Sequence, residues 1–124
     1  MQVKDIMSHD VKLASPDTSV IEAARMMREE DVGAIPVAKG DQLVGMLTDR
    51  DIVVRVLAEG RDCNNAAVRD AMSDEVLYCF EDESVQDVTR NMADVRVRRL
   101  PVVNRDKGLV GIVTLGDLAQ GGAE

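Results

Sequence analysis

A threonine and an aspartate, three positions apart, occur twice in this chain in the same setting. Thr48 and Asp51 close one copy of the motif G-φ-φ-T-x-x-D, where φ is an apolar residue, and Thr114 and Asp117 close the second. A hydroxyl beside an ionised carboxylate can bind the two vicinal hydroxyls of a ribose. A helix that starts at the threonine would also offer free N–H groups to a phosphate. The motif therefore suits a nucleotide.

The same spacing is also typical of a helix cap. In S/T-x-x-D/E the hydroxyl and the carboxylate bind backbone N–H groups at the start of a helix. One interpretation is therefore that Thr48 and Asp51 have no role beyond capping a helix. Alternatively, they cap the helix when no ligand is present, and a ligand uses the same groups when it binds. The glycine that opens each copy, Gly45 or Gly111, would let a ligand approach the backbone closely.

The two motifs belong to an internal repeat that spans the chain. The segment Val3–Met7 matches Val68–Met72, and the spacing between the two motifs is longer than the spacing between these segments by a single position. One residue has therefore been inserted in the second repeat, in the turn at 104–108. Because turns tolerate insertions, this pattern indicates a duplicated unit. We predict two domains, residues 1–62 and 63–124.

Each repeat is predicted to have the element order β-α-β-β-α. Apolar residues recur at helical spacing after Ser19 and after Ser84, and Glu22 three residues beyond Ser19 favours a capping box. A second helix should follow the threonine of each motif. The predicted strands are 11–13, 34–38 and 43–47 in the first repeat, and 76–79, 100–103 and 109–113 in the second.

Composition excludes several classes of function. The net charge of −8 and the presence of one Phe, one Tyr and no Trp disfavour nucleic acid as a partner. No apolar run approaches the length of a membrane span, so we expect a cytoplasmic protein without a membrane partner. Cys63 and Cys79 lack a C-x-x-C pattern and His9 is the only histidine. We therefore expect unpaired thiols, no metal site and an exposed His9.

These features together resemble a tandem pair of cystathionine-β-synthase (CBS) domains, the Bateman module, in its stand-alone bacterial form. The resemblance rests on the duplicated unit, the strand Ile35-Pro36-Val37, the T-x-x-D motif and the lead-in Val3-Lys4-Asp5-Ile6-Met7. It covers essentially the whole chain. It implies an α/β (α+β) fold in which two β-α-β-β-α repeats pack sheet to sheet around an internal pseudo-twofold axis.

The resemblance implies a regulatory module that binds adenine nucleotides in clefts between the repeats. The ligands implied are AMP, ADP, ATP, NAD or S-adenosylmethionine, with no required cofactor and a homodimer as the assembly. No catalytic residue is expected, because the sequence lacks a nucleophile–base pair and a G-x-x-x-x-G-K phosphate loop. The alternative is a stress-associated structural or interaction module that binds an unidentified protein partner and no nucleotide.

The resemblance also implies which residues form each cleft. The first cleft takes Thr48 and Asp51, with Val76 and Leu77 for the base and Arg98 and Arg99 for phosphate. The second takes Thr114 and Asp117, with Val11, Lys12, Gly33 and Ala34. The segment Arg96-Val97-Arg98-Arg99 is the one basic cluster in this acidic chain, and a solvated surface patch remains the alternative interpretation of it.

Overall fold

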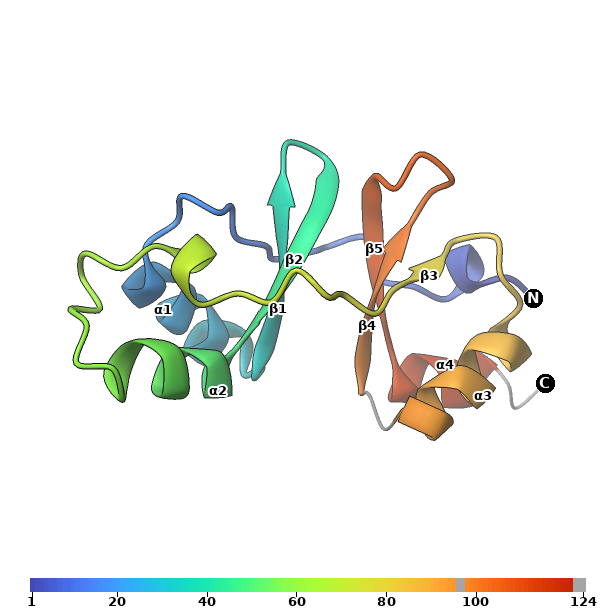
Figure 1. Cartoon of the computed structure of the whole chain (residues 1–124). Helices are drawn as coiled ribbons and strands as arrows, with labels where there is room; N and C mark the ends of the chain where they lie inside the picture. Colours follow the sequence, from blue (N-terminus) through green and yellow to red (C-terminus); the bar gives the residue numbers. More distant parts are fainter. Residues whose placement is uncertain (96–97, 122–124) are drawn as a thin grey trace. The chain divides into compact units, whose positions relative to one another are not determined.

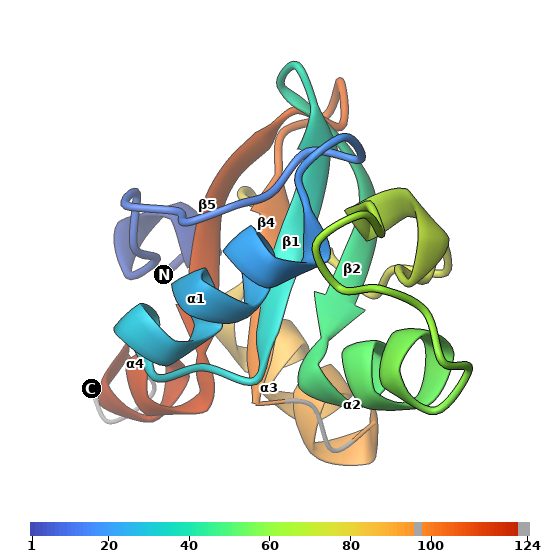
Figure 2. The same ribbon diagram turned by 90° about the vertical axis from the view of Figure 1, so that its left-hand side faces the viewer.

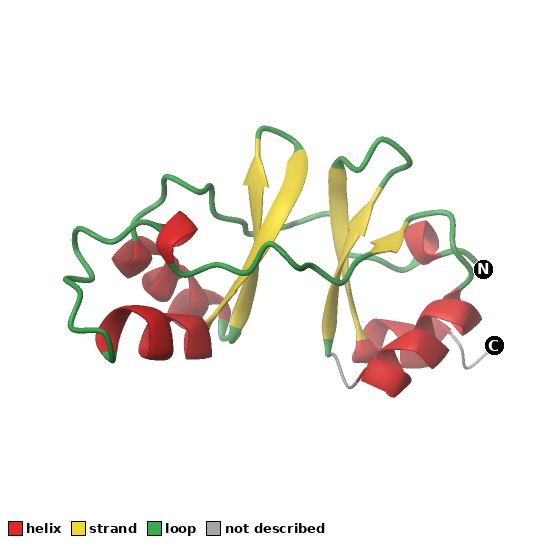
Figure 3. Ribbon diagram, in the orientation of Figure 1, coloured by secondary structure: helices red, strands yellow, loops and turns green. Residues whose placement is uncertain are grey.

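The structure is a computed structural model, and it describes residues 1–95 and 98–121. Helices and short strands alternate along the chain, as Figure 3 shows by colour, so the predicted α+β class is confirmed. The helices are α1 (Val20–Glu30), α2 (Asp49–Ile52), α3 (Val85–Val95) and α4 (Leu115–Gly121). The strands are β1 (Ala34–Lys39), β2 (Gln42–Thr48), β3 (Cys79–Phe80), β4 (Arg99–Val103) and β5 (Leu109–Thr114).

The chain divides into two compact units that exchange their lead-in segments. Lys12–Val76 forms the Thr48 unit, and Met1–Val11 joins the segment that starts at Leu77 to form the Thr114 unit. The short 3-10 helices η1 (Val3–Asp5) and η3 (Val68–Asp70) are the two lead-ins. Each lead-in thus packs beside the motif of the other repeat.

The Thr48 unit is a β-hairpin with both of its helices on one face. Strands β1 and β2 pair antiparallel, and α1 and α2 cover the same side of the hairpin in two perpendicular views (Figures 1 and 2). Helix α2 continues as the π-helix η2 (Val53–Leu57). Most of the buried side chains of this unit form one cluster. Its members are Ala14, Val20, Ala23, Met27, Ile35, Val37, Leu47, Ile52, Val56, Ala66, Val68 and Ala71.

The Thr114 unit has a sheet of three strands in the order β3-β4-β5. Strand β3 runs parallel to β4, and β4 pairs antiparallel with β5. Helices α3 and α4 lie on one side of this sheet (Figure 1). Its core is a separate cluster of Val3, Met7, Cys79, Val85, Val88, Met92, Leu100, Val102, Val113 and Leu118.

The first strand of each repeat is shorter than predicted. The strand expected at 11–13 does not form, and Ala14 makes a single parallel bridge to Val37 instead. Leu13 is 38% exposed and has no strand partner, so apolar character alone did not make this segment a strand. In the second repeat only Cys79 of the predicted strand 76–79 lies in a strand, which extends to Phe80.

The predicted capping box of α1 is only half formed. Ser19 Oγ accepts the N–H of Glu22 at 3.2 Å, but no reciprocal bond from the Ser19 N–H to the Glu22 side chain is present. The helix nevertheless begins and ends close to the predicted residues. It ends at Glu30, and the following residue, Asp31, adopts a left-handed conformation with φ of 54°.

Gly45 and Gly111 were predicted to let a ligand approach the backbone closely. In the structure, the space beside each glycine is filled by residues at the end of a lead-in, so the prediction is wrong. A Cβ on Gly111 would lie 2.6 Å from Sδ of Met7 and 2.9 Å from the carbonyl oxygen of Ser8. A Cβ on Gly45 would lie 2.8 Å from the corresponding carbonyl of Ser73. Contacts this short are not tolerated, so glycine is needed for backbone packing at both positions.

Candidate functional site: two threonine–aspartate turns

Thr48 and Asp51 form a closed capping box at the junction of β2 and α2. Thr48 Oγ1 accepts the N–H of Asp51 at 3.0 Å, and Asp51 Oδ2 accepts the N–H of Thr48 at 2.9 Å. Thr114 and Asp117 repeat the arrangement between β5 and α4, at 3.1 and 3.0 Å. The capping interpretation of the motif is therefore confirmed in both copies.

The capping boxes leave part of each carboxylate unused. In both turns only Oδ2 of the aspartate accepts a hydrogen bond from the described residues. The second oxygen, Oδ1, keeps its lone pairs, and each aspartate is half-buried rather than covered. The threonine hydroxyl accepts a bond through Oγ1 and can still donate one. A ligand hydroxyl can therefore bind without the cap being opened.

Four of the predicted site residues lie beside these turns, on the strand that pairs with the one ending at the threonine or directly before it. The Asp49 N–H donates to Gly33 O at 2.9 Å, and Ala34 pairs with Thr48 across β1 and β2. In the other unit the Leu115 N–H donates to Arg98 O at 3.0 Å. Arg99 pairs with Thr114 across β4 and β5.

The structure thus places the two predicted site residues at the start of each hairpin beside the threonine–aspartate motif at the end of the same hairpin. Gly33 and Ala34 lie with Thr48, and Arg98 and Arg99 lie with Thr114. The sequence prediction paired them with the opposite motif, which belongs to the other unit. That pairing stays a prediction.

Arg99 carries a buried donor that lacks an acceptor. Its Nε is buried and has no hydrogen-bond partner among the described residues. A buried guanidinium N–H without an acceptor is costly, so it favours binding of an oxygen from outside the chain. Arg98 is exposed. Arg96 and Val97, the rest of the predicted basic cluster, lie outside the described residues.

Four predicted site residues, among them the base-contacting Val76 and Leu77, lie where the chain passes from one unit to the other. One passage falls between Val11 and Lys12, and the second falls between Val76 and Leu77. Leu77 is 56% exposed. An exposed aliphatic side chain of this kind is available to a flat, apolar ligand surface.

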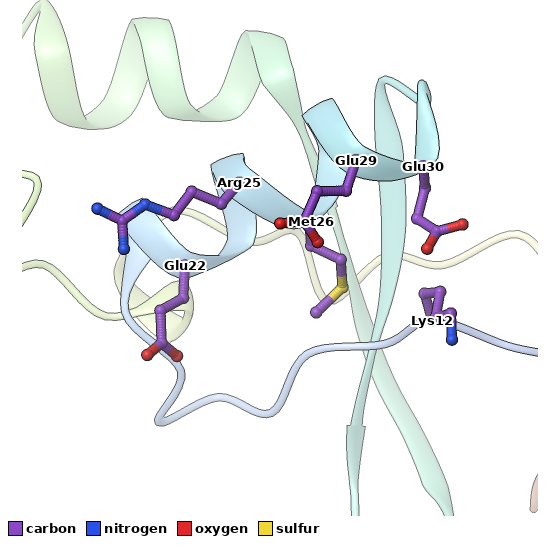
Figure 4. A pocket seen from close by; sticks show the side chains of 6 residues that line it. All are labelled: Lys12, Glu22, Arg25, Met26, Glu29 and Glu30. Atoms are coloured by element: carbon purple, nitrogen blue, oxygen red, sulfur yellow. The ribbon is translucent and has the colours of Figure 1, made fainter.

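A hollow between α1 and the segment that carries Lys12 was not predicted from the sequence. Figure 4 shows five of its lining residues on α1 and the sixth, Lys12, on the segment before Ala14. The six are Lys12, Glu22, Arg25, Met26, Glu29 and Glu30. With three carboxylates against two cations, this hollow does not favour a phosphate.

Sequence reasoning also missed a cluster of aromatic and cationic side chains in the Thr114 unit. The rings of Tyr78 and Phe80 meet edge to face, with centroids 5.7 Å apart. The guanidinium carbon of Arg105 lies 4.1 Å from the centre of the Phe80 ring. The sequence did show that the only two aromatic residues are two positions apart, Tyr78 in the predicted strand 76–79 and Phe80 directly after it.

The remaining predictions concern the two cysteines, His9, metal sites and membrane-spanning helices. Cys63 and Cys79 are free thiols, and His9 is exposed, as predicted. Across residues 1–95 and 98–121, no group of three or more His, Cys, Asp or Glu side chains is arranged to hold a metal ion. In the same residues, no helix has both the length and the apolar character needed to cross a bilayer.

Comparison with known proteins agrees with the duplicated architecture. The CBS domain family matches residues 3–58 and 68–123. The CBS domain-containing protein YhcV of Bacillus subtilis is 46% identical over 117 residues, which are 94% of this chain and 82% of YhcV.

Two solved structures show what similar chains hold. The crystal structure of Hypoxic Response Protein I, described with two coordinated zinc ions, superposes with a TM-score of 0.84 at 39% identity and covers 97% of this chain and 98% of that one. CBSX2, a CBS-pair protein of Arabidopsis thaliana, was solved in complex with AMP. It has a TM-score of 0.83 at 28% identity, covering 98% of this chain and 95% of CBSX2. The chain therefore belongs to the CBS domain family and carries two CBS domains in tandem.

Proposed function

We propose that this protein is a regulatory module that binds an adenine nucleotide, or a related adenosyl ligand, at its threonine–aspartate turns. The observation that carries the proposal is the unused Oδ1 of Asp51 and Asp117 beside a threonine hydroxyl. These groups suit the vicinal hydroxyls of a ribose. The AMP complex of CBSX2 supports an adenosine compound as the class of ligand. The prediction that each site also takes residues of the opposite repeat remains part of this proposal.

Regulation would follow from differential binding. The nucleotide favours one arrangement of the sites and shifts the population of a dimer or partner-binding state. The proposal assigns no catalytic step to the chain. The structural or interaction module without a nucleotide is the alternative, and the experiment below distinguishes the two.

The test separates capping from ribose binding by replacing one oxygen. In Asp51→Asn and Asp117→Asn the remaining carbonyl oxygen can still accept the threonine N–H, because asparagine is a good capping residue. The amide nitrogen that replaces the other oxygen cannot accept a ribose hydroxyl. We expect both variants to melt near the wild-type temperature and each to lose one adenosine-dependent stabilisation.

The chain offers a matched control for this substitution. Asp5 Oδ2 accepts the Gln2 N–H at 2.9 Å, as Asp51 Oδ2 accepts the Thr48 N–H, but Asp5 lies outside the motif. Asp5→Asn should leave nucleotide binding unchanged. Wild-type protein should gain about 2.7 kcal/mol from a nucleotide at ~100 times its Kd. Wild-type melting that is indifferent to AMP, ATP, NAD and S-adenosylmethionine at millimolar concentration would favour the alternative function.

A homodimer is the assembly we propose. Val53, Val54 and Leu57 of η2 are 53%, 44% and 59% exposed. They follow one another on a single helical stretch, and a cluster of exposed aliphatic side chains usually marks an interface. A twofold pairing of this stretch with a second copy would bury them.

A further inference from the structure

A continuous series of contacts ties strand β3 to the turn between β4 and β5. Arg105 binds Asp82 through two parallel bonds, Nε to Oδ2 at 2.9 Å and Nη2 to Oδ1 at 2.7 Å. The same guanidinium lies over Phe80, which meets the edge of Tyr78. The ammonium of Lys107 lies 5.9 Å from the centre of the Tyr78 ring. We call these five residues the aromatic clamp.

The clamp combines contacts that are weak singly but share their members. A bidentate guanidinium–carboxylate pair is the strongest form of an exposed ion pair, and the hydrogen bonds from Arg105 lower the pKa of Asp82. A cation over an aromatic ring adds a further attraction. Because Arg105 makes both contacts at once, it fixes the position of Phe80 relative to the hairpin turn.

The clamp lies immediately after a predicted base-contacting segment. Tyr78 is the next residue after Leu77, and Val76 precedes them both. Cys79 and Phe80 pair with Val102 and Val103 of β4 as a strand. The end of the segment is thus held by backbone pairing and by the clamp.

The first repeat has no equivalent of the clamp. When the repeats are aligned on their lead-ins, Leu13 and Ser15 occupy the positions of Tyr78 and Phe80. Arg105 and Lys107 both lie in the turn that contains the inserted residue. The clamp is therefore a feature of one repeat, and its effect should be confined to one of the two sites.

We propose that Arg105, Phe80 and Tyr78 are positioning residues for the nucleotide site that contains Val76 and Leu77. The clamp holds this segment in place before the ligand arrives, so binding orders fewer residues, and preorganisation of this kind raises affinity. The inference rests on the proposed nucleotide function. According to this proposal, the clamp raises the affinity of one site for adenine and makes no direct contact with the phosphate.

Tyr78 provides a direct reporter of the clamp. It is the only tyrosine, and the chain has no tryptophan, so the near-ultraviolet circular dichroism in the tyrosine band follows this one ring. Arg105→Gln and Phe80→Leu should reduce the band in protein without nucleotide. Phe80→Tyr keeps a ring under the guanidinium, although its added tyrosine prevents use of the band, and it should keep the wild-type affinity.

The binding experiment is AMP calorimetry on the full chain at one salt concentration. Arg105→Gln and Phe80→Leu should weaken about fivefold one of the two AMP binding phases and leave the other unchanged, because the clamp occurs in one repeat only. The control is Arg90→Gln, which removes the same charge from the exposed Arg90–Asp87 pair of α3. This control should change neither the Tyr78 band nor either phase.

The outcomes that contradict the proposal are distinct. A reduced Tyr78 band with unchanged AMP affinity would make the clamp a structural feature alone. Equal weakening of both phases, or the same effect in Arg90→Gln, would show a general change in stability or charge. If wild-type protein binds none of AMP, ATP, NAD and S-adenosylmethionine while the band still responds to Arg105→Gln, the proposed function itself fails, and the nucleotide role of the clamp fails with it.

Discussion

Thr48 and Asp51 cap the same helix start reciprocally. The Thr48 hydroxyl accepts the N–H of Asp51 at 3.0 Å, and the Asp51 carboxylate accepts the N–H of Thr48 at 2.9 Å. Removing the hydroxyl should therefore cost stability with or without a ligand. We expect Thr48→Ala to lower the free energy of unfolding by ~1 kcal/mol, and Thr48→Ser to restore most of it. Urea denaturation measures both. Equal stability of the alanine and serine variants would contradict the capping role.

Gly111→Ala should be more damaging than an ordinary glycine substitution. Its Cβ would lie 2.6 Å from Sδ of Met7, so the lead-in must shift, and overpacking of this kind costs ~1–3 kcal/mol. Gly116→Ala on α4 is the control, because the nearest atom is an ordinary 3.6 Å away and alanine favours a helix. Chemical denaturation should show loss for the first and none for the second. Equal effects would mean that the close approach of the lead-in does not matter.

Cys63 should react with a thiol reagent well before Cys79. Burial, with a smaller contribution from Glu83, raises the pKa of Cys79 from 9.0 to about 12. Its thiolate is therefore scarce and covered, whereas Cys63 is half-buried. Labelling followed by peptide mass mapping should place the first modification on Cys63. Equal labelling rates in the folded protein would contradict the burial of Cys79.

The same pKa gives a pH dependence of stability. The folded state keeps the Cys79 proton where the unfolded state releases it, so the unfolded state binds fewer protons between pH 9 and about 12. Stability should therefore be unaffected below pH 9 and fall as pH rises through this window. In Cys79→Ala this part of the slope should disappear, although the variant is less stable overall. An unchanged slope in the variant would assign the alkaline loss to other groups.

The two nucleotide sites should differ in their dependence on salt. The Asp51 site is predicted to include Arg98 and Arg99, whose guanidinium groups bind phosphate, whereas the Asp117 site is predicted to include Gly33 and Ala34. Arg99→Ala and Asp51→Ala should remove the same tighter phase, which weakens as salt rises. Calorimetry with AMP and with adenosine measures this. If Arg99→Ala removes the phase that depends on Asp117, the arginine serves its own hairpin.

Charge on the exposed face of η2 should prevent self-association. We expect Leu57→Glu and Val54→Glu to give the monomer mass of 13.5 kDa by light scattering, and wild-type protein to give twice that value. Leu13→Glu adds the same charge at another exposed aliphatic residue of the Thr48 unit and should leave the dimer intact. A wild-type mass equal to that of a single chain at high concentration would exclude the dimer.

Local features followed from the sequence because their causes are local. The period of Val20, Ala23 and Met27 predicted α1, and the spacing of Thr48 and Asp51 predicted a helix start together with its cap. The duplicated motifs predicted two similar units. In each case the interacting groups lie within a few residues of one another, so sequence spacing fixes their geometry.

Other features depended on residues that are distant in the sequence. From the sequence, Gly111 was predicted to let a ligand approach the backbone. Only the structure showed that Met7 packs against it and already fills this space. The strand predicted at 11–13 failed because a strand needs a partner along its length, and only Ala14 has one. The composition gave no indication that Arg105 would reach Asp82 and Phe80 at once. Sequence spacing was enough to predict the helices, the hairpins and the caps at Thr48 and Thr114, although the box predicted at Ser19 forms only in part. The side chains that fill the space beside these elements became clear only in the folded chain, because they depend on contacts between segments that are far apart in the sequence.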